Sequence, residues 1–156
     1  MSVLSRYTVL CVIIFLVACT RPENMKNARV AVVPQSGWAH GACISFEPQY
    51  GDTCALYDLT LSVRHTTAYP YRDLNLLVDI VGKDTITSRH RVRMELADAY
   101  GGWQGAGFGG LYQCSVELAR AVAPVDARFI SVWQVMDSVN MLSGVNELVV
   151  TATLSH

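Results

Sequence analysis

The sequence of 156 residues lacks a hydrophobic run long enough to cross a membrane as a helix. Its clearest apolar run, Thr8 to Ala18, has 11 residues, whereas a spanning helix needs about 20. Arg6 and the free amino terminus place positive charge ahead of this run, and small residues end it. This arrangement is typical of a cleavable secretory signal peptide, so we expect residues 1–18 to be a signal.

The end of that run, Leu16-Val17-Ala18-Cys19, matches the lipobox of bacterial lipoproteins at all four positions. In such proteins the cysteine thiol takes a thioether-linked diacylglycerol, and cleavage then exposes its amine. Each buried methylene contributes about 0.8 kcal/mol, so two or three chains hold a protein firmly at a membrane. We predict lipidation of Cys19, a polar tether over 19–28 and a single domain over 29–156. The alternative is an ordinary signal peptide with a chance cysteine.

The sequence also lacks an excess of charge of one sign. Removing residues 1–18 takes away Arg6 and no acid, which leaves 11 basic and 13 acidic side chains. Binding of nucleic acid or anionic lipid needs clustered Lys and Arg, and no such cluster is evident. We therefore expect no nucleic-acid partner, and the charge balance leaves proteins or neutral ligands as partners. Of these we expect other envelope proteins, and a small-molecule ligand is not expected.

Patterns of cysteine and histidine that bind metals are missing. No C-x-x-C spacing occurs, and the four histidines are scattered, so we predict no metal site. In an oxidising compartment Cys43 and Cys54 are the nearest pair for a disulfide, with Cys114 left over. The alternative is that all three are small buried apolar residues.

Recognisable catalytic motifs are absent as well. The stretch 101–110 has Gly-x-Gly spacing but no βαβ context for a phosphate-binding loop. Asp58 near Arg64 and His65 has no nucleophile in a recognisable elbow. We predict a protein without catalytic residues or cofactor, apart from the covalent lipid.

What the sequence has is β-strand signals. Apolar residues alternate with polar ones from Tyr57 to Arg64, and the pattern recurs at 74–80 and 91–96. Further strand candidates, rich in Val, Thr and aromatic residues, are 110–122, 127–137 and 145–154. Turn-forming residues separate them, at 69–73, 81–84, 100–110, 123–126 and 140–144. The spacing predicts an all-β, antiparallel β-sandwich of jelly-roll type. Only 112–122 is compatible with a helix in composition, and its context favours a strand.

Aromatic side chains lie in or beside the expected loops, where binding residues gather on a rigid sandwich. They are Trp38, Tyr69, Tyr71, Trp103, Phe108 and Tyr112. They either close the ends of the core or form an interface patch, since Trp and Tyr dominate binding hot spots.

Several segments together resemble the gliding motility lipoprotein GldH family of the Bacteroidota. These are Gly37-Trp38, Arg64-His65 with Tyr69-Pro70-Tyr71 and Leu74-x-Leu76, Asp84-Thr85, Gly102-Trp103-Gln104-Gly105-Ala106-Gly107 with Tyr112, Gln134-x-Met136, and Leu142-x-Gly144-Val145. The resemblance covers roughly residues 37–150. This chain has Asp137 where family members tend to carry a basic residue.

The resemblance implies an outer-membrane lipoprotein of the gliding motility or type IX secretion machinery, without catalytic residues. Because only one acid follows Cys19 in Thr20–Asn24, we expect attachment to the periplasmic face. A glycan-binding module and a general envelope-assembly lipoprotein are the alternatives, and a hydrolase ranks third. The residues predicted to form the interaction site are Trp38, Arg64, Tyr69, Tyr71, Trp103, Tyr112 and Gln134.

Overall fold

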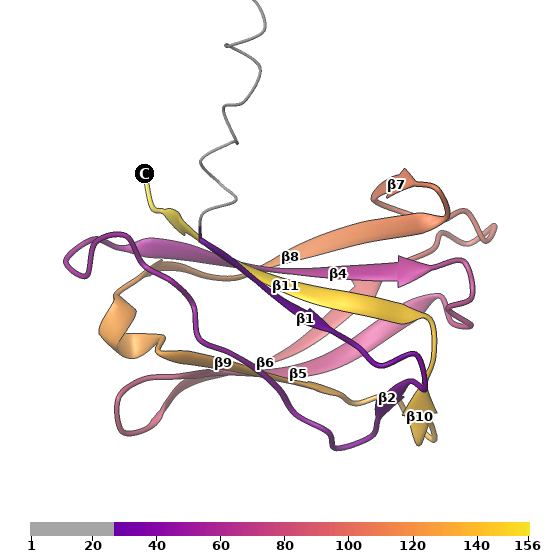
Figure 1. Cartoon of the computed structure of the whole chain (residues 1–156), viewed down its shortest axis with the longest axis horizontal. Coiled ribbons are helices and arrows are strands. Elements are labelled where there is room, and N and C mark those ends of the chain that lie inside the picture. Colours follow the sequence, from indigo (N-terminus) through magenta and orange to yellow (C-terminus); the bar gives the residue numbers. More distant parts are fainter. Residues whose placement is uncertain (1–26) are drawn as a thin grey trace, which may run out of the picture.

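The structure, a computed structural model, describes residues 27–156, so the predicted signal, Cys19 and most of the tether lie outside the described residues. The described chain forms two facing layers of strands (Figure 1). The strands are β1 (Ala28–Val32), β2 (Trp38–Ala39), β3 (Ile44–Phe46), β4 (Tyr57–Thr66), β5 (Asp73–Val81), β6 (Ile86–Glu95), β7 (Ala106–Phe108), β8 (Leu111–Val122), β9 (Phe129–Gln134), β10 (Met141–Leu142) and β11 (Val145–Leu154). A 3-10 turn, η2, spans Pro124–Asp126.

The strand order confirms the predicted jelly-roll sandwich. One large sheet has the order β1-β11-β4-β8-β7, the other has the order β3-β9-β5-β6, and β10 pairs with β2 in a separate two-stranded sheet. All pairings within both large sheets are antiparallel. Apart from the β5–β6 hairpin, successive long strands cross from one sheet to the other, which is the jelly-roll connectivity. We call the large sheets the β4 sheet and the β5 sheet.

The central strand β4 shows why the alternation produces this fold. Its odd-numbered residues from Tyr57 to His65 are at most 1% exposed, while Asp58, Thr60 and Arg64 face outward. Leu74, Leu76, Val78 and Ile80 of β5 face them from the opposite sheet and are equally buried. Period-two patterning therefore places one face of each sheet in a shared apolar core.

Residues 111–122 form a strand, as predicted, and not a helix. The segment pairs with β4 along its whole length, and this pairing satisfies backbone groups that a helix would have satisfied internally. The register shifts near its end, where Ala121 has φ of 50° and donates its backbone N–H to the Asp58 carboxylate at 2.9 Å. One expectation fails nearby: the predicted turn 100–110 contains the short strand β7.

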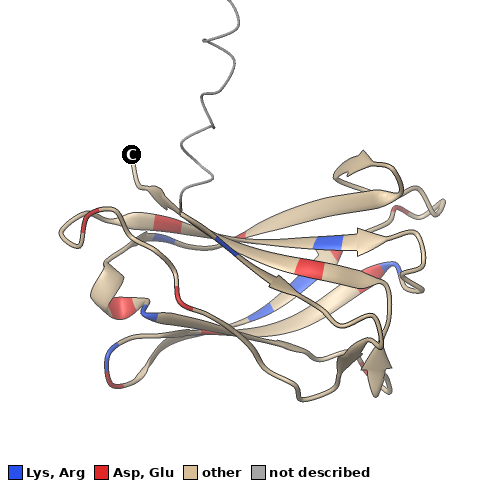
Figure 2. Ribbon diagram, viewed as in Figure 1, with Lys and Arg blue, Asp and Glu red and all other residues tan. Residues whose placement is uncertain are grey.

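The two ends of the sandwich differ in what they carry. The start of β1 lies beside the C-terminal strand, where the Ala152 N–H donates to the Asn27 carbonyl at 3.4 Å. The opposite end carries the β4–β5 loop, the β6–β7 loop and the β7–β8 turn (Figure 1). Charged residues of both signs are interspersed over the ribbon (Figure 2). The loop end is therefore distinguished by its side chains and not by a field of one charge.

Candidate functional site

The loop end is built around a buried histidine. His65, the last inward-facing residue of β4, is 0% exposed. Its ring centroid lies 4.8 Å from that of Trp103, 5.7 Å from Tyr69 and 5.8 Å from Tyr112. Two segments distant in sequence from His65, those of Trp103 and Tyr112, thus meet the imidazole beside the nearby Tyr69, and all four residues belong to the motifs quoted above. Sequence order alone did not show that they touch.

Only one of the two ring nitrogens of His65 has a hydrogen-bond partner in the described chain. Its Nδ1 lies 3.2 Å from the Thr66 carbonyl oxygen, from which we infer that the neutral ring carries its proton there. Its Nε2 is buried and has no hydrogen-bond partner within residues 27–156. Burial lowers the pKa of His65, because the charged form loses more hydration than the neutral form.

Two glycines permit the close packing of this end. A Cβ on Gly144, whose φ is +81°, would lie 2.4 Å from the Cα of Tyr69. A Cβ on Gly105, also at φ +81°, would lie 2.1 Å from the Gln113 carbonyl oxygen. Only glycine combines positive φ with such an approach of two backbones. These motif glycines are therefore explained by geometry.

Three of the residues predicted for interaction are structural instead. Trp38 is 2% exposed and donates its indole N–H to the Ala42 carbonyl at 2.9 Å. Tyr69 is 3% exposed and donates its hydroxyl to the Asp73 carbonyl at 2.8 Å, and burial raises its pKa. The amide of Gln134 is fully buried, where it donates to the Val139 carbonyl and accepts from the Met136 N–H. These side chains fix loops and are not free to meet a partner.

Three further predicted residues, Arg64, Trp103 and Tyr112, are partly exposed but engaged within the chain. Arg64 lies on the outer face of the β4 sheet, where it donates to Gln113 Oε1 at 2.7 Å and pairs with Glu147 at 3.2 Å. Trp103 packs against the core and pairs with Ala97 in an isolated bridge. Tyr112 is half-buried and stacks on His65. Tyr112 lies within β8, and Trp38 and Phe108 also lie in strands, although the sequence analysis assigned these aromatics to loops or their borders.

At the loop end three aromatic side chains are exposed, and we call them the exposed aromatic set: Tyr71, Tyr100 and Phe108, which are 40%, 98% and 94% exposed. They belong to the β4–β5 loop, the β6–β7 loop and β7, all at the loop end. Tyr71 is held edge-on against the buried Tyr69, with centroids 5.8 Å apart. Of the predicted site residues only Tyr71 belongs to this set. Tyr100 was missed because a lone tyrosine between alanine and glycine gives no signal in sequence.

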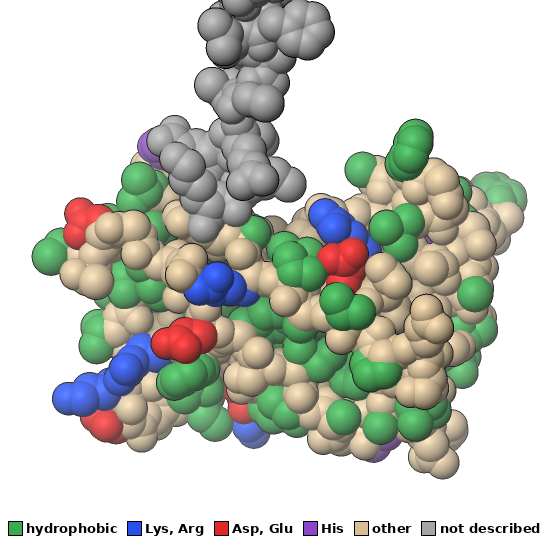
Figure 3. Space-filling model, in the orientation of Figure 1, with side chains coloured by type: hydrophobic (Ala, Val, Ile, Leu, Met, Phe, Trp, Pro, Cys, Tyr) green, Lys and Arg blue, Asp and Glu red, His purple; other side chains and the backbone are tan. Residues whose placement is uncertain are grey.

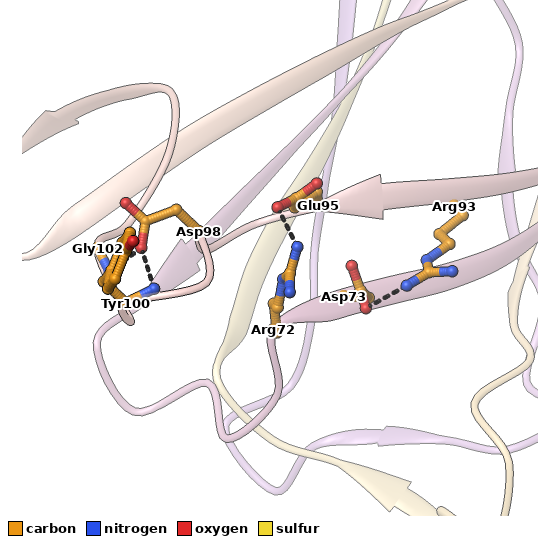
Figure 4. A network of polar contacts seen from close by, with 7 residues as sticks. All are labelled: Arg72, Asp73, Arg93, Glu95, Asp98, Tyr100 and Gly102. Carbon is orange, nitrogen blue, oxygen red and sulfur yellow. Dashed lines mark hydrogen bonds and ion pairs between the residues drawn. The ribbon is translucent and has the colours of Figure 1, made fainter.

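An ordered turn presents Tyr100 (Figure 4). One carboxylate oxygen of Asp98 accepts the N–H groups of Tyr100 and Gly102, each at 2.8 Å. The Asp98 N–H donates to the Gly102 carbonyl at 2.8 Å, which closes the turn. A nearly fully exposed ring on such a turn has its backbone already fixed for contact with another molecule.

Figure 4 also shows two ion pairs beside that turn. Arg72 pairs with Glu95 at 2.5 Å, and Asp73 pairs with Arg93 at 2.8 Å. The carboxylates next to Tyr71 are thus bound by arginines of the same chain. This matters for the glycan-binding alternative, because a sugar site needs free carboxylate or amide groups beside its aromatic platform.

The cysteines do not follow the sequence expectation. Cys43, Cys54 and Cys114 all have free thiols, so the suggested Cys43–Cys54 disulfide is not formed. Cys43 precedes β3 in the β5 sheet, and Cys54 lies in the loop that leads to β4 in the other sheet. The alternative of three buried thiols is also wrong, since Cys43 and Cys54 are exposed and only Cys114 is half-buried. Burial raises the pKa of the Cys114 thiol.

Within residues 27–156, no group of three His, Cys, Asp or Glu side chains is placed to hold a metal ion. The same residues include no helix with the length and hydrophobicity to span a membrane.

The fold and this end of the molecule define a class: a jelly-roll domain whose loop end is closed by an aromatic cluster and displays further aromatic rings. A family model described as GldH lipoprotein matches residues 27–150. The chain therefore belongs to the GldH lipoprotein family. Membership implies a lipoprotein associated with a membrane.

Comparison with curated proteins gave no match. Among solved structures, similar chains include three viral proteins: the VP2 subviral particle of infectious bursal disease virus (11% identity, TM-score 0.36, 81% of this chain and 33% of that one), the coat protein of tobacco streak virus (6%, 0.31, 89% and 91%) and a nora virus structure (13%, 0.34, 82% and 53%). This chain thus spans about a third of the VP2 chain. Similarity at this level carries no argument about function, and the fold assignment rests on the strand order above.

Proposed function

We propose that this protein is a non-enzymatic accessory lipoprotein of the outer membrane, held by lipid on Cys19 at the periplasmic face. Its domain docks through the exposed aromatic set on cell-envelope machinery for gliding motility or type IX secretion. The observation that carries the proposal is the display of Tyr71, Tyr100 and Phe108 at one end. Family membership supports the envelope context.

The physical case for docking rests on the contrast between the buried and the displayed rings. Tyr69 and His65 close the end of the core, so the fold does not need Tyr71 or Phe108 for burial. Hydrophobic side chains project from the surface where β7 lies (Figure 3). Exposed aromatic residues on a rigid support lose little conformational entropy on binding and are enriched at interface hot spots.

A protein partner is favoured over a glycan, because the carboxylates of Asp73 and Glu95, which flank the β4–β5 loop and end β6, are engaged by Arg93 and Arg72. The balanced charge agrees with a partner recognised by shape and apolar contact. It gives no support to recognition of nucleic acid or anionic lipid.

The test is co-purification from crosslinked envelopes. A full-length chain with an affinity tag at the C-terminus replaces the native copy, and the tag lies at the end opposite the exposed aromatic set. We expect Tyr71→Ser combined with Phe108→Ser to lose the co-purified envelope proteins and to reproduce the motility or secretion defect of a deletion strain. The matched control is Val30→Ser with Val32→Ser, two exposed apolar residues on β1.

Near-ultraviolet circular dichroism of both double variants checks that the domain stays folded. Retention of every partner by the Tyr71 and Phe108 variant would contradict the docking proposal. Loss of partners with intact motility and secretion would instead favour a general envelope-assembly role.

A further inference from the structure

The outer face of the β5 sheet carries a second feature that the proposed function does not use. In the register of β5 and β9, Leu77 lies opposite Trp133, and Val81 lies opposite Phe129. Directly opposed residues of antiparallel strands point to the same face. Their neighbours Leu76, Val78, Ile130 and Val132 are buried in the core, so Leu77, Trp133 and Phe129 point outward.

These outward residues do not contribute to the core. Phe129 is 40% exposed, and Leu77, Val81 and Trp133 are partly exposed. None of them belongs to the core cluster or to the partly buried residues that pack against it. The Trp133 indole N–H has no hydrogen bond within the described chain, whereas the buried Trp38 indole does. The strand β9 thus carries large apolar side chains on both faces, with Ser131 between Phe129 and Trp133 on the outward one, although only one face meets the opposite sheet.

A row of three arginines borders this apolar surface on β6. Arg89, Arg91 and Arg93 lie opposite Asp79, Leu77 and Asn75. Arg89 makes two hydrogen bonds of 2.6 Å to the buried carboxylate of Asp79, and Arg93 pairs with Asp73 at 2.8 Å. The middle one, Arg91, is exposed, lies opposite the apolar Leu77, and forms no ion pair with any carboxylate in residues 27–156.

Within the described chain, Arg91 is therefore an unpaired cation in an apolar surface. An arginine–carboxylate ion pair lies on each side of it. We propose that the outer face of the β5 sheet, from Phe129 and Trp133 through Leu77 to Arg91, is a protein-docking surface. Its partner is a protein that presents an apolar strip with a carboxylate placed to meet Arg91.

Charge complementarity favours a protein partner that carries a carboxylate. Arginine and tryptophan are the residue types most enriched at binding hot spots, and Arg91 offers a planar guanidinium suited to a carboxylate. A glycan site would normally set several free carboxylates or amides beside the indole, but Asp79 and Asp73 are occupied by Arg89 and Arg93, and Asn75 offers the single free amide on the outward face of β5. A second copy of this chain would have to supply its own free carboxylate at the apolar surface, and the described face offers none.

The test uses site-specific photo-crosslinking of the full-length chain in its native envelope. A photoreactive side chain replaces Ser45, which is exposed and lies opposite Ser131 on this same face. A second probe at the exposed Asn146, at the start of β11 in the other sheet, serves as the position control. Each probe is combined with Arg91→Glu, or with Lys83→Glu as a matched charge reversal in the β5–β6 loop.

We expect the Ser45 probe to give a protein adduct of defined mass that the Asn146 probe does not give. Arg91→Glu should lower its yield about tenfold, because like charges facing each other across an interface cost more than the 1.4 kcal/mol that a factor of ten represents. Lys83→Glu should leave the yield within twofold of the unmodified chain. Sequencing the adduct should locate the crosslink in an apolar segment of the partner, on a surface that also carries an acidic residue.

Four results would overturn the proposal: no adduct, an adduct unaffected by Arg91→Glu, an adduct resistant to protease with the properties of a glycan, or a crosslinked dimer of this chain. Thermal unfolding of the Arg91→Glu chain should match wild type. If Arg91→Glu lowers the melting temperature so far that the domain unfolds under the conditions of crosslinking, the adduct is lost through unfolding, and this result would also contradict the proposal.

Discussion

At the scale of single residues, His65 has the most unusual environment in the described domain. Its ring is enclosed by Trp103, Tyr69 and Tyr112, and its Nε2 has no partner in residues 27–156. Protonation would put a charge into an apolar cluster without a carboxylate acceptor for it. The neutral ring is therefore the form that the folded domain holds.

The first prediction concerns acid stability. The pKa of His65 is lowered in the folded state, whereas the unfolded chain titrates near 6.5. The contribution of the neutral His65 ring to the free energy of unfolding is fully present above about pH 6.5. It falls as pH drops below that value, because the unfolded state takes up the proton first. We expect His65→Phe to make the melting temperature less dependent on pH between about pH 5 and 7. The control is His40→Gln, which replaces an exposed histidine. An unchanged slope in the His65 variant would contradict this.

The second prediction separates two costs of replacing glycine. Gly144 and Gly101 have φ of +81° and +83°, but only Gly144 has backbone atoms within reach of an added Cβ. Gly101→Ala should cost about 1–2 kcal/mol from its conformation alone. Gly144→Ala should cost several kcal/mol more, by displacing Tyr69. Urea denaturation of both variants measures the difference, and equal costs would show that the Tyr69 contact is unimportant.

The scale of elements explains how the loop end stays ordered. The Asp98 turn joins β6 to β7, and its order depends on one carboxylate oxygen that accepts two backbone N–H groups. Because hydrogen bonds to charged groups are among the stronger ones in proteins, this single side chain holds the backbone beneath Tyr100.

The third prediction follows from that turn. Asp98→Ala should speed hydrogen exchange of the Tyr100 and Gly102 amides by about tenfold or more, while the melting temperature changes little. Asp98→Asn keeps an acceptor oxygen and should stay closer to wild type. Equal exchange in the alanine variant and wild type would mean that the turn is held by other contacts.

The fourth prediction compares two ion pairs on the β5 sheet. The Asp79 side chain is 4% exposed and that of Asp73 is 23% exposed, and each is paired with an arginine of β6. Hydrogen bonds from Arg89 lower the pKa of Asp79, so that pair stabilises the fold above the unfolded pKa near 4 and loses this effect as pH falls. At pH 7, Arg89→Met should destabilise by about 1–3 kcal/mol, more than Arg93→Met, because it leaves a buried carboxylate unpaired. Chemical denaturation of the two variants measures both costs, and a larger effect at Arg93 would contradict this ranking.

Elements also mark how far the sequence could predict the fold. The alternation at 57–64 predicted β4, since a strand with one wet face has a clear period of two, and the content of Val and Thr at 145–154 predicted β11. The strands β2, β3 and β10 have only two or three residues, too few for a period to appear. In β9 both faces carry large apolar side chains, so the sequence could not show that Trp133 faces outward while Val132 is buried.

Sequence patterns were equally limited in predicting the candidate functional site. Tyr69 and Tyr71 have the same residue type and the same loop, yet one is 3% exposed and the other is 40% exposed. Gln134 was expected at an interface, but its buried amide has two internal partners that no local pattern reveals. The convergence on His65 depends on contacts between β4, the β6–β7 loop and β8, which only tertiary structure establishes.

At the scale of the whole molecule, the exposed aromatic set lies at the end of the sandwich opposite the C-terminus and the start of β1 (Figure 1). If the predicted lipid on Cys19 anchors the chain, residues 20–27 reach at most about 28 Å from the membrane to β1. The loop end then projects beyond the attachment point, where it is free to meet a partner in the same envelope.

The measurement that tests this account most directly is hydroxyl-radical footprinting of the full-length lipoprotein, in native envelopes and after purification in detergent. Aromatic rings are oxidised readily when exposed, so mass spectrometry reports each ring separately. The account predicts that Tyr71 and Phe108 are protected in the envelope and become reactive on purification, while the buried Tyr69 stays unreactive in both. Equal reactivity of Tyr71 and Phe108 in the two preparations would show that the loop end meets no partner.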